Sequence, residues 1–243
     1  MTLFIDQVSF TYHQQPIVSN FSLTVEKGEF VSLIGKSGSG KSTILKMIAG
    51  LLQPDKGRIL LDEAIPSRGS FGYMPQQDLL LPWRTVLENV MLGSEIKKGS
   101  VYTKEEAREW LRETGLAKWE NALPKQLSGG MKQRIAFVRT LLTGAKVLLL
   151  DEPFGALDAF TKRDMQKWLV SIWEDLDKTI LFITHDLEEA ILLSDRILLL
   201  HPQQGVQEIR VDLPRPREAG MIYTASLIEY RKELERRITD GLV

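Results

Sequence analysis

The stretch that decides the fold is Gly35-Lys36-Ser37-Gly38-Ser39-Gly40-Lys41-Ser42-Thr43, which matches the pattern G-x-x-x-x-G-K-[ST]. It stands between two apolar runs, residues 30–34 and residues 44–49. The first run predicts a strand and the second a helix, and a strand that leads through this pattern into a helix forms a phosphate-binding loop. The alternative, a flexible glycine-serine turn with a chance lysine, does not account for both flanking elements.

This loop has the chemistry of an anion site. Its glycines let the backbone approach phosphate oxygens closely, and successive N–H groups point inward at the start of a helix. Lys41 is expected to reach the β- and γ-phosphates, and Ser42 to place its hydroxyl on Mg²⁺. The residues expected to hold a nucleoside triphosphate are Gly35, Lys36, Ser37, Gly38, Ser39, Gly40, Lys41, Ser42 and Thr43.

The composition limits the class of protein. The 243 residues have a formal net charge of -1 and are 43% hydrophobic and 26% charged, which suits one large α/β domain or a domain with an inserted lobe. This charge balance gives no support to nucleic acid as a partner. The absence of cysteine excludes disulfides and thiol nucleophiles. Residues 1–6 lack a signal-peptide pattern and no apolar run is long enough to span a bilayer, so we expect a soluble cytoplasmic protein.

Two kinds of strand are predicted. Alternation of apolar and polar residues is typical of antiparallel strands, whereas continuous apolar runs are typical of buried parallel strands. The alternating segments are residues 3–12 and 17–25, with short strands at 58–61 and 71–74. The continuous runs are residues 146–151 and 179–184, and a hairpin is expected from 197–200 to 206–211 around the turn 202–205.

Helices are predicted for most of the middle of the chain, roughly residues 83–142. Residues 85–92 are expected to begin a helical region, a second helical region is 103–114 and a helix is expected at 128–142. A further helix, 162–176, is expected between the two parallel runs. Thr103 and Glu106 resemble a capping box. Near the C-terminus, apolar residues at helical spacing indicate a helix with a packing stripe; they are Leu227, Tyr230, Leu234 and Ile238.

A pair of carboxylates, Asp151 and Glu152, follows the run 146–151. Sites in open α/β sheets form at the carboxyl ends of strands. Asp151 is therefore expected to hold Mg²⁺, directly or through water, and Glu152 to polarise the attacking water. The alternative is an Asp-Glu-Pro helix cap, and the preceding phosphate loop favours the chemical interpretation.

A second anion site is indicated by Ser128, Gly129 and Gly130 at the start of a predicted helix. Since one loop already holds one triphosphate, the simplest reason for a second is that it closes over nucleotide held by another copy of the chain. The alternative is a helix N-cap with a glycine-rich start.

Three further residues are candidates because of their place at strand ends. His185 follows the run 179–184, where it can reach the γ-phosphate or its attacking water, and Gln76 follows the strand 71–74, where its amide can bond Mg²⁺ or water. Tyr12 ends an early strand and can stack on adenine. The alternatives are a solvated loop histidine, a loop amide and a partly exposed strand aromatic.

Together these residues resemble the nucleotide-binding subunit of an ABC transporter. Tyr12 resembles the adenine-stacking aromatic and Gln76 the Q-loop, and the other motifs correspond to Walker A at 35–43, the signature at 127–133, Walker B at 147–152, the D-loop at 156–158 and the switch histidine His185. The resemblance implies an α/β fold: a P-loop NTPase (RecA-like) core with an antiparallel β subdomain and an inserted helical subdomain at about 83–142. The ATP-binding domain would cover 1–217 and a C-terminal helical tail 218–243.

The resemblance also implies a mechanism with ATP and Mg²⁺ as cofactors. Two copies would form a head-to-tail homodimer with each ATP between Walker A of one copy and the signature of the other. Glu152 would act as base on the attacking water, with Lys41, His185 and Gln76 around the phosphates. Asp158 would link the two sites across the interface.

A narrower resemblance concerns the transported solute. The segments 80–83, 151–158, 184–190 and 213–217 are similar to the ATPases of nitrate, sulfonate and taurine importers, a group that includes subunits for a thiamine-precursor pyrimidine. This implies integral membrane permease subunits that contact residues 77–83, an extracytoplasmic solute-binding protein, and a peripheral position at the cytoplasmic face of the membrane. The solute would be a small anionic or sulfonate-type compound or, alternatively, the pyrimidine.

Two other classes of protein are alternatives. A soluble ABC ATPase that acts on nucleic acid or the ribosome usually carries long coiled-coil insertions or two cassettes, and this chain has neither such heptads nor a second Walker A. A P-loop kinase of small molecules leaves the signature and His185 unexplained.

Overall fold

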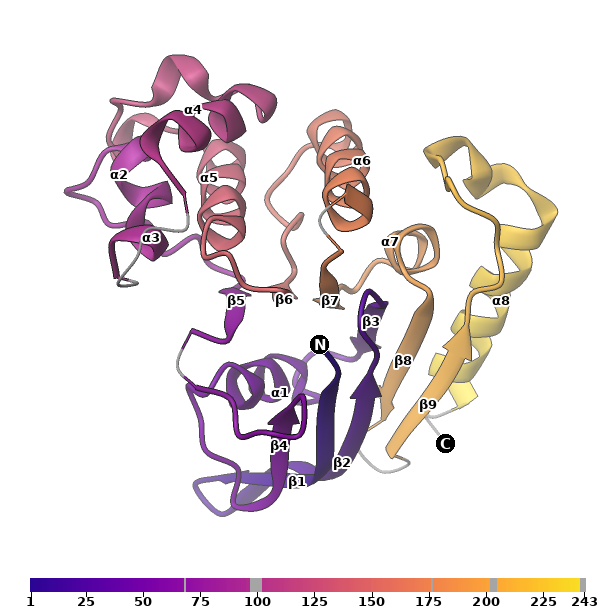
Figure 1. Cartoon of the computed structure of the whole chain (residues 1–243). Coiled ribbons are helices and arrows are strands. Elements are labelled where there is room, and N and C mark those ends of the chain that lie inside the picture. Colours follow the sequence, from indigo (N-terminus) through magenta and orange to yellow (C-terminus); the bar gives the residue numbers. More distant parts are fainter. Residues whose placement is uncertain (68, 97–101, 176, 202–204, 241–243) are drawn as a thin grey trace.

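Two β-sheets organise the chain, with helices between and around them (Figure 1). The structure is a computed structural model and describes residues 1–67, 69–96, 102–175, 177–201 and 205–240. The smaller sheet is antiparallel, with the order β2-β1-β4, and the larger has the order β5-β6-β7-β3-β8-β9. The strands are β1 (Leu3–Tyr12), β2 (Gln15–Val25), β3 (Phe30–Gly35), β4 (Lys56–Leu61), β5 (Phe71–Met74), β6 (Val147–Asp151), β7 (Thr179–Ile183), β8 (Arg196–His201) and β9 (Gly205–Arg210).

The helices follow the strands in a regular way. One follows β3, a group of four lies between β5 and β6 in the sequence, and the rest follow β6, β7 and β9. They are α1 (Lys41–Ile48), α2 (Val86–Val90), α3 (Leu92–Ile96), α4 (Lys104–Glu113), α5 (Gly129–Leu141), α6 (Ala159–Asp175), α7 (Leu187–Leu193) and α8 (Ala225–Asp240), with short 3-10 turns at Ala117–Trp119, Pro124–Gln126 and Ala219–Tyr223.

The larger sheet brings the ends of its central strands to one edge. Strands β5, β6, β7, β3 and β8 are parallel, and only β9 runs antiparallel to its neighbour β8. The register pairs Asp151 with Ile183, and Ile183 with Leu33 on β3. The loops after β3, β5, β6 and β7 therefore leave the sheet side by side, which is where open α/β sheets form their sites.

Helix α1 is held between the two sheets. Its buried residues Ile44, Leu45 and Ile48 share one apolar core with Leu3 of β1 and Leu33 of β3. Full burial of each such side chain contributes about 1.5–3 kcal/mol, so this helix is fixed from both sides. The loop that precedes α1 is positioned by the same packing.

The helices α2 to α5 form a lobe that lies apart from the antiparallel sheet (Figure 1). The predicted capping box is confirmed, because the Glu106 backbone N–H donates to Thr103 Oγ1 at 3.2 Å and the Thr103 N–H donates to Glu106 Oε2 at 2.6 Å. The helical region predicted to begin at residues 85–92 consists of two short helices, α2 and α3, with Met91 between them. No helix in the described part of the chain is both long and apolar enough to cross a bilayer.

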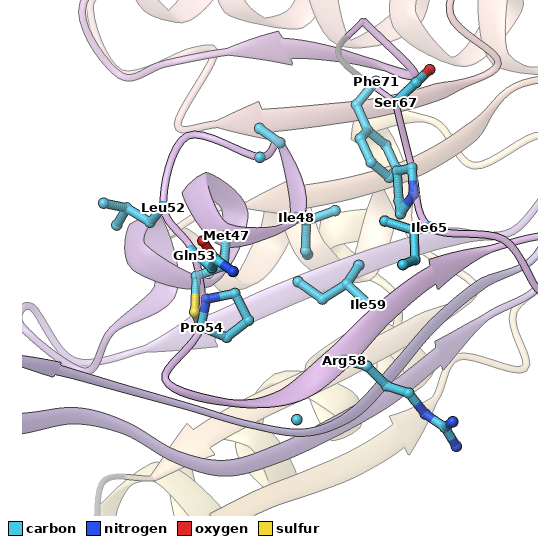
Figure 2. A pocket seen from close by; sticks show the side chains of 14 residues that line it. Met47, Ile48, Leu52, Gln53, Pro54, Arg58, Ile59, Ile65, Ser67 and Phe71 are labelled. Atoms are coloured by element: carbon cyan, nitrogen blue, oxygen red, sulfur yellow. The ribbon is translucent and has the colours of Figure 1, made fainter.

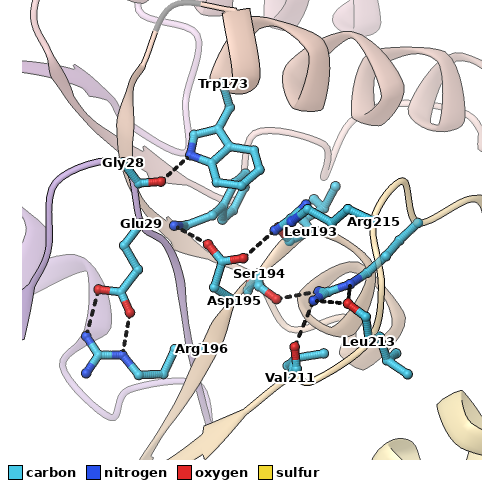
Figure 3. Close-up of polar contacts among 12 residues, drawn as sticks. Gly28, Glu29, Trp173, Leu193, Ser194, Asp195, Arg196, Val211, Leu213 and Arg215 are labelled. Carbon is cyan, nitrogen blue, oxygen red and sulfur yellow. Dashed lines mark hydrogen bonds and ion pairs between the residues drawn. The ribbon is translucent and has the colours of Figure 1, made fainter.

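The last part of the chain packs against the face of the larger sheet opposite to α1. Figure 3 shows Arg215, which donates to Asp195 Oδ1 at 2.8 Å and lies 4.2 Å over the ring of Trp173. The side chain of Arg217 donates to backbone carbonyls that include Ile191 at 2.9 Å and Val211 at 2.8 Å. These contacts anchor the segment that leads to α8, whose predicted apolar stripe packs in the same core as α7.

Most differences from the predicted elements are at their ends. The helix predicted from 162 begins at Ala159, because Asp158 accepts hydrogen bonds from the backbone N–H groups of Phe160 and Thr161. Helix α7 was not predicted; it is short, and Asp186 caps it through the N–H groups of Glu188 and Glu189. The β8–β9 hairpin is confirmed, while turn residues 202–204 lie outside the described residues.

Candidate active site

The loop between β3 and α1 owes its shape to glycines. Gly38 and Gly40 have φ angles of 80° and 92°, in the left-handed region that glycine adopts without strain. A Cβ atom on Gly40 would lie 2.9 Å from the carbonyl oxygen of Ile17 on β2. The antiparallel sheet therefore crowds the loop, and the fold of this chain alone explains why Gly40 is glycine.

Lys41, the first residue of α1, is buried and its side chain turns back along the loop. Its Nζ donates to the carbonyl oxygens of Gly35 at 2.7 Å and Lys36 at 2.8 Å. Burial lowers the pKa of the Lys41 ammonium, and the carboxylates of Glu152 and Asp151 act in the opposite direction. A buried cation held by neutral carbonyls is a strong partner for phosphate oxygens.

Asp151 is the last residue of β6 and is only 3% exposed. Burial raises the pKa of this carboxyl, while a hydrogen bond from the Ser42 hydroxyl lowers it. A carboxylate and a hydroxyl in contact are hard oxygen ligands of the kind that Mg²⁺ prefers. Among the described residues no three acidic, histidine or cysteine side chains form a metal cluster, and Mg²⁺ does not need one when phosphate and water complete its shell.

Glu152 is the point at which the predicted residues converge. Its φ of 49° lies in the left-handed region, which is uncommon for a residue with a side chain. Gln76 Nε2 donates to Glu152 Oε2 at 3.0 Å, and His185 Nδ1 lies 3.5 Å from the same oxygen. The three side chains come from the loops after β5, β6 and β7, so the shared edge of the sheet brings them together.

These groups and the loop surround one hollow of about 530 Å³. It is lined by Gly35, residues 37–43, Gln76, Glu152, His185 and Ile17. Helix N–H groups and an ammonium therefore face a carboxylate, an amide and an imidazole across one space. This arrangement can bind a polyphosphate, and it has a base with which to activate water at the end of that polyphosphate.

Ile17 is the one lining residue that sequence reasoning missed. It lies on β2, far from the loop in sequence, and its backbone oxygen closes the space beside Gly40. The alternation of β2 predicted a strand but could not show which loop the strand would touch. A contact between distant segments leaves no local signal in the sequence.

Several predicted residues lie outside this hollow. Tyr12 is 60% exposed at the end of β1, with its ring 4.3 Å from that of His13, and Lys36 is exposed. Asp151 lies beneath the hollow's wall and contacts it through Ser42. Asp158 is exposed at the start of α6, where hydrogen bonds from Thr161 lower the pKa of its carboxyl. The nucleotide contacts predicted for Tyr12 and Asp158 stay predictions.

The signature residues are also apart from the hollow, at the other predicted anion site. Ser128 Oγ accepts from the N–H of Met131 at 3.3 Å and so caps α5. Ser128 and Gly129 are exposed, and a Cβ atom on Gly129 would have no described residue within 4 Å apart from its chain neighbours and its own helix. The start of α5 is thus not part of the lining of the hollow around residues 35–43.

A second hollow has a different character. It lies at the C-terminal end of α1 and has a volume of about 410 Å³. Figure 2 shows Met47, Ile48, Ile59 and Phe71 among its lining side chains. Among the described residues that line it, Arg58 is the one that carries a charge. The described lining of this hollow includes no carboxylate or imidazole, whereas the polar hollow at the opposite end of α1 has both, in Glu152 and His185.

Known proteins are similar in sequence to this chain over most of its length. Residues 18–155 match the ABC transporter family. The formylaminopyrimidine import ATP-binding protein ThiZ of Halalkalibacterium halodurans is 45% identical over 247 residues, which cover 99% of this chain and 96% of that protein. The aliphatic sulfonates import ATP-binding protein SsuB 1 of Rhodococcus jostii is 44% identical over 237 residues, which cover 97% of this chain and 91% of that protein.

The fold is shared with a solved structure as well. A dimeric structure of a post-hydrolysis state of the ATP-binding cassette MJ0796, bound to ADP and Pi, has a TM-score of 0.79 and 30% identity to this chain. It covers 87% of this chain and is itself covered completely. The predicted fold is therefore confirmed, and these relatives give no support to the alternative of an ATPase that acts on nucleic acid or the ribosome.

Proposed function

The chain belongs to the ABC transporter family and is an ATP hydrolase of that family, and from this premise we propose that two copies of it energise a membrane importer. One observation carries the proposal. The hollow that holds Lys41 and Glu152 lacks Ser128, Gly129 and Gly130 at the start of α5, of which Ser128 and Gly129 are exposed and Gly130 is half-buried. Each copy therefore has half of two sites, and a head-to-tail homodimer would complete both.

The proposed hydrolysis is an in-line attack by water on the γ-phosphate. Glu152 takes the proton of that water or orients it, and Gln76 and His185, which contact the same carboxylate oxygen, hold the carboxylate in place. Lys41 and the N–H groups of the loop stabilise the negative charge on the phosphate oxygens. Serine and glycine of the partner's signature segment close over the same phosphates.

The hydroxyl of Ser42 and the carboxylate of Asp151 fit Mg²⁺, because they are oxygen ligands already in contact at the edge of the hollow. Gln76 is the third candidate ligand through its amide oxygen. When bound, Mg²⁺ would neutralise charge on the β- and γ-phosphates. Asp151 then needs to be ionised, and a cation beside it would offset the burial that raises its pKa.

The membrane partner of this subunit would be an integral permease. Its proposed contact surface is residues 77–83, where Leu79 is 58% exposed and Trp83 is 72% exposed. Exposed apolar side chains next to Gln76 suit a contact that reports on the nucleotide. The protein would then lie at the cytoplasmic face of the membrane, and an extracytoplasmic solute-binding protein would deliver solute to the permease.

The solute class follows from the relatives. The names of the two similar proteins refer to import of aliphatic sulfonates and of formylaminopyrimidine, at 44% and 45% identity. We propose a small sulfonate-type or anionic solute, with a thiamine-precursor pyrimidine as the second candidate. Uptake of each labelled compound by cells with and without this gene product would decide between them.

We also propose a division of the chain into an ATP-binding domain, residues 1–217, and a C-terminal helical tail, residues 218–243. The helical subdomain, residues 83–142, would be the part that moves against the sheet. Arg217 marks the boundary, since its side chain is fixed by carbonyls such as those of Ile191 and Val211. Limited proteolysis in the presence and absence of ATP would test these limits.

The Glu152→Gln variant tests the proposed mechanism. ATP binding should survive, because the amide keeps the shape of the carboxylate, while turnover should fall by about 100- to 10,000-fold with the loss of the base. A dimer that holds uncleaved ATP should accumulate in size-exclusion chromatography. The control is Glu174→Gln on the exposed surface of α6. Full turnover by the Glu152 variant, or an ATP-bound protein that stays monomeric, would contradict the proposal.

A further inference from the structure

A buried glutamine joins the signature helix to the backbone of Glu152. Gln133 lies on α5, one turn beyond its start, and is 5% exposed. Its side-chain Nε2 donates to the carbonyl oxygen of Glu152 at 3.1 Å, and its Oε1 accepts from the N–H of Ala156 at 2.8 Å. One amide thus holds both ends of the loop between Walker B and the D-loop.

The two hydrogen bonds fix the orientation of this amide, because its nitrogen can only donate and its oxygen can only accept. They also act on an unusual stretch of backbone. Glu152 has a φ of 49°, its N–H donates to Ile183 at 3.0 Å, and its carbonyl accepts from Gly155 at 3.2 Å in addition to Gln133. The backbone conformation of Glu152 decides where its carboxylate points, and Gln133 is the side chain that braces it.

Packing makes the contact between α5 and this loop continuous. A Cβ atom on Gly130 would lie 3.2 Å from Leu157 Cδ2, so the first turn of α5 rests on the loop directly. Phe154 is 3% exposed and shares an apolar core with Ile135 of α5. A shift of α5 would therefore move the loop, and the Gln133 amide would carry that shift to Glu152 itself.

We propose that Gln133 is a positioning residue that couples the two ATP sites of the dimer. The inference rests on the proposed function, in which the start of α5 contacts the ATP held by the partner copy. In that dimer Gln133 joins the part of the chain that senses the partner's ATP to the carboxylate that cleaves the chain's own ATP. Each copy would place its base only when the partner's nucleotide is engaged.

The test is Gln133→Met, which keeps the length of the side chain and removes both hydrogen bonds. Turnover should fall by about 100-fold, the size of effect expected when a catalytic group is misplaced by about an ångström. The KM for ATP should stay unchanged. In the Glu152→Gln background, the ATP-bound dimer should still accumulate, because the signature segment itself is intact.

The matched control is Thr140→Val, which also removes a buried hydrogen bond on α5, from Thr140 Oγ1 to Ala136 at 2.9 Å, but does not touch the loop. It should lower stability without lowering turnover. If Gln133→Met does not fold, Gln133→Glu serves instead, since it keeps the acceptor for Ala156 and loses the donor to Glu152; its turnover should fall as well.

Two results would overturn the inference: a folded Gln133 variant with the wild-type rate, or loss of the ATP-bound dimer when Gln133→Met is combined with Glu152→Gln. The second result would make Gln133 a part of the signature contact itself. Failure of the proposed function is separate, because it would appear as full turnover or a missing dimer in the single Glu152→Gln variant, with Gln133 unchanged.

Discussion

Two helices of this protein begin with the same kind of sequence and differ in what surrounds them. Helix α1 follows Gly38-Ser39-Gly40, and α5 begins at Gly129 and Gly130 after Ser128. Both offer backbone N–H groups and a helix dipole to an anion. The start of α1 is enclosed by the antiparallel sheet, since a Cβ on Gly40 would lie 2.9 Å from the carbonyl oxygen of Ile17. A Cβ on Gly129 would have no neighbour within 4 Å in the described part of the chain beyond its own helix.

The different surroundings indicate why each position, Gly40 and Gly129, has a glycine. At Gly40 the φ of 92° and the contact with Ile17 both exclude a side chain, so the chain's own fold accounts for it. At Gly129 neither the backbone conformation nor the described neighbours require glycine, and glycine has a lower helix propensity than alanine. A glycine that its own chain does not need indicates close approach by something outside the chain, such as a phosphate held by a second copy.

The largest expected effect comes from replacing the lysine near the start of each helix, Lys41 on α1 and Lys132 on α5. Lys41→Ala should lower the rate of hydrolysis by about 100- to 1,000-fold and weaken ATP binding, because it removes the buried cation from the phosphates. Lys132→Ala, on the fourth residue of α5, should change the rate far less. Steady-state hydrolysis and binding of a fluorescent nucleotide would measure both. Equal losses in the two variants would remove the proposed distinction between the helix starts.

A second pair of variants separates stability from function. Gly40→Ala should destabilise the protein by about 1–3 kcal/mol, since it forces a side chain into the left-handed region and against Ile17. Gly129→Ala should change the free energy of unfolding by less than about 0.5 kcal/mol, as expected for an exposed position. Its hydrolysis and its ATP-driven dimerisation should nevertheless fail, because the methyl group would stand between the helix and the partner's nucleotide.

Urea denaturation of both variants without nucleotide, followed by hydrolysis assays, would measure this pair. A Gly129→Ala variant as active as the wild type would contradict the proposed role of Gly129, because the open space there would then not be needed for hydrolysis. The same role would be contradicted if Gly129→Ala were destabilised as much as Gly40→Ala, because Gly129 would then be needed for the fold of its own chain.

Local patterns predicted much of the fold and of the candidate site. The strand Phe71–Met74, the start of α5 at Gly129 and the capping box at Thr103 follow from the sequence, since each depends on residues within a few positions of one another. The parallel runs also predicted that Glu152 and His185 would leave the same edge of one sheet. The distances to Glu152 Oε2, 3.0 Å from Gln76 Nε2 and 3.5 Å from His185 Nδ1, agree with that placement.

Contacts between distant segments could not be predicted in this way. The packing of Ile17 against Gly40 depends on how the antiparallel sheet sits on α1, and the bonds of Gln133 to Glu152 and Ala156 depend on how α5 lies against a loop. Neither relation leaves a periodic or compositional signal. The sequence showed Gln133 as the end of the signature motif, and only the fold shows which backbone it holds.

The smallest expected effect concerns the caps of two helices. Thr103→Ala should lower the free energy of unfolding by about 1 kcal/mol, and Ser128→Ala should lower it by less. The reason is that Thr103 and Glu106 cap each other through two hydrogen bonds, whereas Ser128 only accepts one, of 3.3 Å, from the N–H of Met131. Hydrolysis should respond in the reverse order: Ser128→Ala should lower it and Thr103→Ala should not, since only the α5 start is proposed to face the partner's phosphate. Thermal unfolding and hydrolysis rates would be measured on both proteins. If activity follows stability in the two variants, Ser128 is a cap for its own helix and no more, and the case for a shared site would then rest on Gly129 alone.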